Sequence, residues 1–283
     1  MNGKIKTLLK DSISYGLTLS LSKFAFLLLI PIYTGFLSVG RYGVLDTLLL
    51  IGTMLTILFL FGQEEALGRF IYDTEESRRK ELSGSVFSNI LTLSLLITSL
   101  LFLFSEPIVK LIFKTNEYVY EFRLILLYSF STALLTFFRS LARWEFKKKA
   151  YFFLTLAPTL SIIFLTFIAI VILDLGIRGA LYSQIFSNTL FTFISLFLFR
   201  FSFPNKQFFL PLLKYGAPMM AAVFLISANS VIDKTFYIRL FGENTLGLYS
   251  MGGRYALFIA LPQSAFWVAW GPLIFSTYKD KDV

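Results

Sequence analysis

A lysine stands inside an apolar segment near the start of the chain. Lys23 lies about eleven residues into the run 12–37, whose other residues are mostly apolar. An ammonium group at the centre of a bilayer costs roughly 2.5–3.5 kcal/mol on insertion scales, so it should face an acidic partner or a water-filled cavity. No Asp or Glu stands at a similar depth in the first six apolar segments. We therefore expect Lys23 to contact an anionic ligand or to take part in ion coupling; the alternative is a structural lysine.

A second charged group lies in the seventh apolar segment. Asp233 and Lys234 are adjacent, and Asn229 precedes them by one helical turn. Asp233 could pair with Lys23 or with Arg254 at the start of the next segment. The adjacent charges could form a gate or coupling element, or a clamp that packs two helices together.

The densest basic patch follows the fourth apolar segment. Arg139, Arg143 and Lys147 recur every four residues, which places them on one face of a helix, and Lys148 and Lys149 follow directly. This face could receive phosphate groups or anionic lipid headgroups. The alternative is that it only sets the orientation of the chain in the membrane.

Other charged residues stand near the ends of the apolar segments. Arg69 and the cluster 63–65 follow the second segment and could form an inner gate or simply be solvated. Asp46 and Asp174 could bind a coupling cation, but a carboxylate near the membrane interface costs little. We expect these two carboxylates to be solvated.

The chain lacks the residues that several kinds of chemistry require. The chain has no Cys and no His, which excludes disulfides, thiol redox chemistry and His-based catalysis, and it removes the usual ligands of zinc and haem. No phosphate-binding loop of the G-x-x-x-x-G-K-S/T type occurs, and no long loop carries an Asp-x-Asp pair. We expect a protein that is not an enzyme and that needs no cofactor.

The composition determines which elements position these residues. Hydrophobic residues make up 56% of the chain and charged residues 15%, whereas soluble domains carry about 25% charge. The apolar residues form blocks long enough to cross a hydrocarbon core of about 30 Å as helices. We predict an all-α integral membrane protein with about eight spans: 12–37, 44–62, 84–104, 119–138, 152–173, 179–200, 215–240 and 255–276.

Four of these spans contain a proline: Pro31, Pro158, Pro218 and Pro262. Each removes a backbone hydrogen bond and should kink its helix. In lipid the freed carbonyl needs a donor from a neighbouring helix or from water.

The basic residues indicate an orientation. Seventeen Lys and Arg residues lie on the side of the N-terminus and seven on the other. The positive-inside rule places the N-terminus in the cytoplasm, and we expect the bacterial inner membrane. Because the basic residues border apolar spans, the net charge of +9 does not indicate nucleic-acid binding.

Two segments of the chain are similar to each other. Tyr15-Gly16 opens the first span and Tyr215-Gly216 the seventh, and each pair follows Leu-Leu-Lys. Glycine-containing turns follow both spans, at 36–43 and 240–247. This parallel repeat predicts a six-helix lobe over 1–205 and the start of a second lobe over 206–283.

The sequence also resembles a known family. The resembling segments are Pro31-Ile32-Tyr33-Thr34, Arg41-Tyr42-Gly43, Gly68-Arg69-Phe70, Tyr215-Gly216-Ala217-Pro218, Asp233-Lys234, Gly247-Leu248-Tyr249-Ser250 and 265–272. In this order they are similar to oligosaccharide flippases of the Wzx type, within the multidrug/oligosaccharidyl-lipid/polysaccharide exporter superfamily. That family has twelve or more spans, so the chain looks C-terminally incomplete.

The resemblance implies a flippase for surface polysaccharide such as O-antigen of lipopolysaccharide, capsule or exopolysaccharide. Its expected partners are an undecaprenyl-pyrophosphate-linked oligosaccharide, membrane lipids and other polysaccharide assembly proteins. Lys23, Arg139, Arg143 and Lys147 are then candidate substrate contacts, and Arg69, Asp233 and Lys234 candidate gate or coupling residues. The alternatives are a multidrug exporter of the same superfamily, a polysaccharide polymerase and an inactive fragment.

Overall fold

The computed structural model describes the backbone of residues 2–200 and 202–279 and the side chains of 15–200 and 202–253. The described backbone is helical and contains no strand. The α-helices are α1 (Asn2–Leu27), α2 (Leu29–Phe36), α3 (Val39–Leu60), α4 (Gln63–Phe70), α5 (Arg79–Leu103), α6 (Ser105–Phe113), α7 (Val119–Trp144), α8 (Lys148–Phe167), α9 (Gly176–Leu198) and α10 (Lys206–Lys279). A 3₁₀ turn (Glu76–Arg78) precedes α5, and a π-helical turn (Ile168–Ile172) extends α8.

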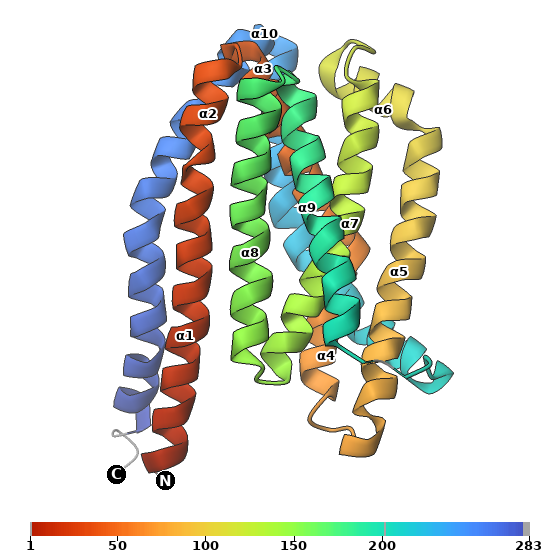
Figure 1. Cartoon of the computed structure of the whole chain (residues 1–283), viewed down its shortest axis with the longest axis vertical. Helices are drawn as coiled ribbons and strands as arrows, with labels where there is room; N and C mark the ends of the chain where they lie inside the picture. The colour runs from red at the N-terminus through yellow and green to blue at the C-terminus, as the bar shows by residue number, and fades with distance from the viewer. Residues whose placement is uncertain (1, 201, 280–283) are drawn as a thin grey trace.

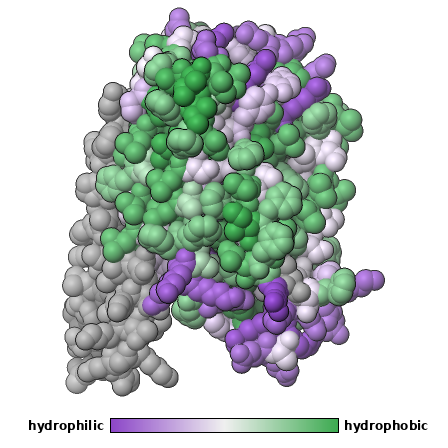
Figure 2. All heavy atoms as spheres, viewed as in Figure 1, coloured by the Kyte–Doolittle hydropathy of each residue, from purple (hydrophilic) through white to green (hydrophobic). Residues whose placement is uncertain are grey.

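The long helices run side by side as an upright bundle (Figure 1). The start of α1 and the end of α10 lie at one end, which we call the proximal end. The short helix α6 and the bend of α10 lie at the opposite, distal end. Apolar side chains cover the middle of the visible face, and polar ones gather at both its ends (Figure 2). This distribution is that of a protein surrounded by lipid at mid-height.

The expected fold class is confirmed. Within the described residues, seven segments are long and apolar enough to cross a membrane: Tyr15–Phe36, Val39–Leu60, Glu76–Leu103, Val119–Trp144, Lys148–Ile172, Gly176–Leu198 and Lys206–Gly253. They contain or overlap the first seven expected spans. The eighth, 255–276, has a helical backbone, and its side chains lie outside the described residues.

Helix α10 is two helices in sequence. Gly242 has φ 82° and ψ 176°, a conformation outside the helical region, and it separates 206–241 from 243–279. Only glycine adopts such a backbone without strain. The turn expected after the seventh span therefore exists, and it returns the chain from the distal to the proximal end.

Two of the four prolines have visible effects. The first expected span breaks at Leu28, three residues before Pro31, because the proline ring cannot donate to the carbonyl of Leu27 and collides with it. In contrast, α8 continues through Pro158. The carbonyl that Pro158 leaves free belongs to Leu154, and Arg139 of α7 donates its Nε to that oxygen at 2.8 Å.

Helix α3 packs mainly against α10. Their backbones touch at both ends through pairs of glycines. A Cβ atom added to Gly43 would lie 2.6 Å from the nitrogen of Gly247, and one added to Gly62 would lie 2.3 Å from the oxygen of Gly216. No side chain fits at either contact, so glycine is required for the two helices to approach this closely.

Candidate functional site

A buried ion pair joins α3 to both halves of α10. Lys234 is 8% exposed and Asp46 is 4% exposed. The ammonium group of Lys234 donates to the carboxylate of Asp46 and, at 3.0 Å, to the hydroxyl of Ser250. Lys234 precedes the bend at Gly242 and Ser250 follows it. The pair therefore fixes three chain segments to one another in the distal half of the bundle.

The expectation that Asp46 is solvated was wrong. The carboxylate lies one helical turn from Gly43, where α3 and α10 are in backbone contact. This close packing excludes water from the space between the helices. A carboxylate there is tolerated because the Lys234 ammonium compensates its charge.

Further contacts close the distal end around this pair. Tyr118 donates its hydroxyl to Glu243 at 2.8 Å, and Lys114 donates its Nζ to the carbonyl of Arg239 at the same distance. Burial raises the pKa of the Tyr118 phenol well above its usual range, and the hydrogen bond to Glu243 adds to the effect. Both contacts join the loop before α7 to the bend of α10. In this structure the distal end between α3 and α10 is shut.

Asp233 does not take part in the buried pair. It is exposed and accepts a hydrogen bond from the hydroxyl of Tyr249, whose ring stacks on Tyr237 at 4.1 Å. The structure thus brings Asp233 to Tyr249 rather than to Lys23. The other expected partner, Arg254, has its side chain outside the described residues.

Lys23 is exposed on α1. Its neighbour Ser22 shares a hydrogen bond of 2.8 Å with Thr159, and Tyr15 packs edge-on against Tyr151, so this face of α1 contacts α8. Lys23 lies about 100° around the helix from Ser22 and therefore points away from α8. Within the described side chains it has no ion pair.

The basic face of α7 does not act as one patch in the structure. Arg139 donates a hydrogen bond to the Leu154 carbonyl of α8, which Pro158 leaves without its helical donor. Arg143 lies 3.7 Å from Glu65 and stacks on Trp144, 4.6 Å from the ring centre. Each of these two arginines therefore has a packing role at its position.

Lys147 and Arg69 lie at the proximal surface. Lys147 pairs with Glu145 at 2.6 Å and lies over the ring of Phe199. Arg69 pairs with Asp73 one turn later at 2.6 Å, and both side chains are 56% exposed. Exposed pairs of this kind contribute about 0–1 kcal/mol. The geometry of Arg69 fits a solvated helix end better than a gate.

Sequence reasoning did not single out Glu64. This side chain lines a small cavity of about 100 Å³ with Met219 and Met220 of α10, next to the Gly62–Gly216 contact. Burial raises the pKa of Glu64, and the charge of neighbouring Glu65 adds to the effect. The sequence shows the acidic cluster 63–65, but only the packing of α10 in the structure shows that Glu64 is half-buried.

Helices α3 and α10 thus lie side by side. The Asp46–Lys234 pair holds their distal contact closed, and a smaller proximal contact lies at Gly62 and Gly216. The family model for polysaccharide biosynthesis proteins matches residues 8–277. The chain belongs to this family. No curated protein sequence matches the chain.

Solved transporter structures share the fold of this chain. One is the MATE multidrug transporter DinF-BH, solved in complex with a ligand, with a TM-score of 0.71, 18% identity and coverage of 95% of this chain and 64% of that one. Another is a MOP superfamily transporter from Pyrococcus furiosus, described as having a binding pocket of reverse polarity, with a TM-score of 0.71, 18% identity and coverage of 93% and 64%.

A third match is the outward-facing conformation of a multidrug resistance MATE family transporter, with a TM-score of 0.70, 18% identity and coverage of 93% and 65%. The chain thus spans a little less than two thirds of each of these three structures. At this identity the likeness shows the fold alone. The fold is one that the chain shares with multi-pass membrane transporters.

Proposed function

We propose that this protein is a flippase that moves a polyprenyl-pyrophosphate-linked oligosaccharide across the cytoplasmic membrane for surface polysaccharide assembly. The family match over residues 8–277 carries the proposal. The protein has no bond to make or break in this role. It replaces water around the sugar and phosphate with cavity groups, and a conformational equilibrium moves the headgroup.

In this proposal the first lobe comprises 1–205 and the second begins at 206. The Asp46–Lys234 pair is the distal gate, because α3 and α10 separate at the distal end only if these two charges part. Ser250 follows the bend of α10 and also accepts from Lys234, so the second half of that helix is tied to the same gate. Asp233 adds a contact within the same bend.

The proximal end faces the cytoplasm in this proposal, because it carries most of the Lys and Arg residues. Lys23 is the proposed deep contact for the pyrophosphate, since it is exposed and points away from α8. Arg143 and Lys147 lie nearer the surface, where they would attract the anionic headgroup first. Arg139 supports this region through its bond to α8. Arg69, in an exposed pair with Asp73, is given no gate role in this proposal.

A second candidate is a multidrug exporter, favoured by the likeness to MATE multidrug transporters. A carrier of cationic drugs should present acidic groups to its interior. The exposed charge at mid-depth on α1 is instead the cation Lys23. This observation favours an anionic substrate.

Complementation tests the proposal. The complete coding sequence is expressed in a strain that lacks its own oligosaccharide flippase, and surface polysaccharide is measured on intact cells. We expect export with the wild type and with Lys23→Arg, and loss of export with Lys23→Ala at equal membrane abundance. Lys110→Ala is the matched control, since Lys110 is an exposed lysine of α6 at the distal end. Normal export by Lys23→Ala would reject the assigned role of Lys23. No export by any version present in the membrane would favour the drug exporter.

A further inference from the structure

A charged hollow lies at the distal end within the first six spans. It has a volume of about 310 Å³ and is formed by the starts of α3, α7 and α9 and by the turn before α9. We call it the distal pocket; its lining residues are Arg41, Glu117, Glu121, Asp174, Leu175, Gly176, Ile177 and Arg178. Its size is at the lower end of the range for small-molecule sites, about 300–1,000 Å³.

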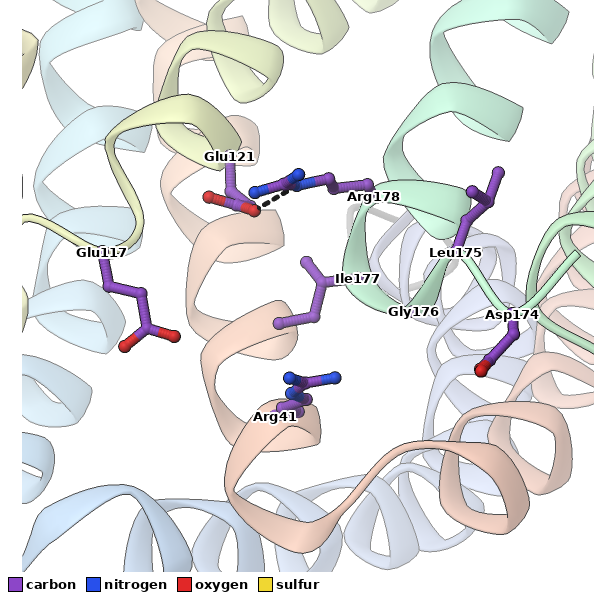
Figure 3. A pocket seen from close by; sticks show the side chains of 8 residues that line it. All are labelled: Arg41, Glu117, Glu121, Asp174, Leu175, Gly176, Ile177 and Arg178. Atoms are coloured by element: carbon purple, nitrogen blue, oxygen red, sulfur yellow. Dashed lines mark hydrogen bonds and ion pairs between the residues drawn. The ribbon is translucent and has the colours of Figure 1, made fainter.

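One wall of the distal pocket is held rigidly. The Nε of Arg178 donates to Glu121 at 2.7 Å (Figure 3). The guanidinium of Arg178 also lies 4.9 Å from the ring centre of Tyr120. Glu121 is 6% exposed, and its second oxygen has no hydrogen-bond partner within the described residues. Because Nε is used on Glu121, the terminal nitrogens of Arg178 stay available as donors.

The remaining charges surround an apolar floor. Arg41, Glu117 and Asp174 are exposed and have no ion pair within the described side chains. Figure 3 shows them spaced around the hollow, with Ile177 projecting between them. Three carboxylates and two guanidiniums thus surround an apolar centre.

The backbone fixes one side of this arrangement. Asp174 and Gly176 both have positive φ, 50° and 55°, so the turn before α9 doubles back tightly. A Cβ added to Gly176 would meet only the end of the Arg41 side chain, 3.9 Å away. Asp174 accepts a conformation that is unfavourable for most residues, which keeps its carboxylate at the rim of the pocket.

We infer that the distal pocket binds a single pyranose ring of a sugar. A pyranose has an apolar C–H face, which fits against Ile177, and a rim of hydroxyls that both donate and accept. Carboxylates of Glu117 and Asp174 accept from these hydroxyls, and the guanidinium of Arg41 donates to them. A phosphate fits less well, because three carboxylates line the hollow against two guanidiniums. Within the described residues, no group of three acidic side chains is placed to hold a metal ion.

The role of the pocket in transport rests on the proposed function. With the proximal end in the cytoplasm, the distal pocket faces the side on which the headgroup emerges. A weak sugar contact there would hold the released oligosaccharide near the exit. Binding of a sugar by the distal pocket does not depend on the proposed transport function.

Saturation-transfer difference NMR on the full chain in lipid nanodiscs tests the inference. The probes are methyl α-D-glucopyranoside, methyl α-D-galactopyranoside and N-acetyl-D-glucosamine. We expect transfer to the ring C–H protons of at least one probe. The double variant Arg41→Gln/Asp174→Asn should weaken its binding by about tenfold or more, because each substitution removes a charged hydrogen-bonding partner. Lys110→Gln, at the same end but outside the pocket, should bind as the wild type does.

Several outcomes would overturn the inference. These are transfer to no probe, equal transfer in the double variant, or displacement of the probe by calcium or inorganic phosphate at submillimolar concentration. If the double variant is not monodisperse, Arg41→Gln and Asp174→Asn are tested separately instead. Complementation with the same variants separates the two proposals. Sugar binding without export by the wild type would reject the flippase and keep the pocket, whereas export without sugar binding would reject only the pocket.

Discussion

Replacing Lys234 by methionine tests the central ion pair. The substitution keeps the length of the side chain and leaves the Asp46 carboxylate, 4% exposed, without its ammonium partner. Removing one partner of a buried pair costs about 3–5 kcal/mol. Solvent screens this pair little, because the side chains of Lys234 and Asp46 are only 10% and 6% exposed. We expect the free energy of unfolding to fall by about this amount.

The double variant Asp46→Leu/Lys234→Met gives the decisive comparison. It removes both charges, so no uncompensated carboxylate remains, and such replacements are often neutral or stabilising. The assay is unfolding in mixed micelles of dodecyl maltoside and SDS, followed by tryptophan fluorescence. A loss below about 1 kcal/mol for Lys234→Met, or an equal loss for the double variant, would refute the reasoning.

A labelling experiment reports on the same contact in the membrane. The chain has no cysteine, so Leu246→Cys introduces a single thiol at a position that is 0% exposed beside Gly43. If the pair holds the distal end closed, Lys234→Met should speed the reaction of this thiol with a membrane-impermeant maleimide. An unchanged labelling rate would show that other contacts, such as Tyr118 with Glu243, keep the helices together.

Three other substitutions have expected outcomes. Gly43→Ala places a methyl group 2.6 Å from the backbone nitrogen of Gly247 and should lower stability by about 1–3 kcal/mol in the same micelle assay, whereas Gly35→Ala, with no atom within 4 Å, should cost much less. Arg139→Met should lower stability by about 1–3 kcal/mol, because it leaves the Leu154 carbonyl without a hydrogen-bond donor. In a Pro158→Ala background the same substitution should cost much less, because the alanine restores the backbone N–H. Equal losses of stability in both backgrounds would contradict this. The raised pKa of Glu64 means that the folded state binds a proton more readily than the unfolded state does, so stability should fall as the pH rises from the ordinary value of 4.5 through the raised pKa. Glu64→Gln should flatten this dependence in thermal unfolding scans, and exposed Glu75→Gln should not.

The fold was predictable because its signals are local. Apolar blocks of helical length, their bordering charges and the glycine turn at 240–247 all lie within short stretches of sequence. The break at Leu28 follows equally directly from Pro31. Such features depend on neighbours in the chain and on the thickness of a bilayer.

The partners of the charged residues were not predictable from the sequence. Asp46 and Lys234 are separated by 188 positions, and nothing in either segment shows that α3 and α10 touch at Gly43 and Gly247. The same holds for Arg139. The sequence shows that Pro158 must free a carbonyl, but only the packing of α7 on α8 shows which donor reaches it.

The two glycine contacts between α3 and α10 have a mechanical consequence. Gly43 lies on α3 and Gly62 follows its end, so the helical stretch from Gly43 to Leu60 separates the two contacts by about 26 Å. If the proximal contact at Gly62 and Gly216 acts as a fulcrum, α3 is a lever arm of about that length. A tilt of about 10° would then part the distal ends by about 5 Å, roughly the thickness of a sugar ring, while the backbones near Gly62 hardly move. In the proposed transport cycle, the spacing of these two glycines therefore sets the distance over which the distal gate opens.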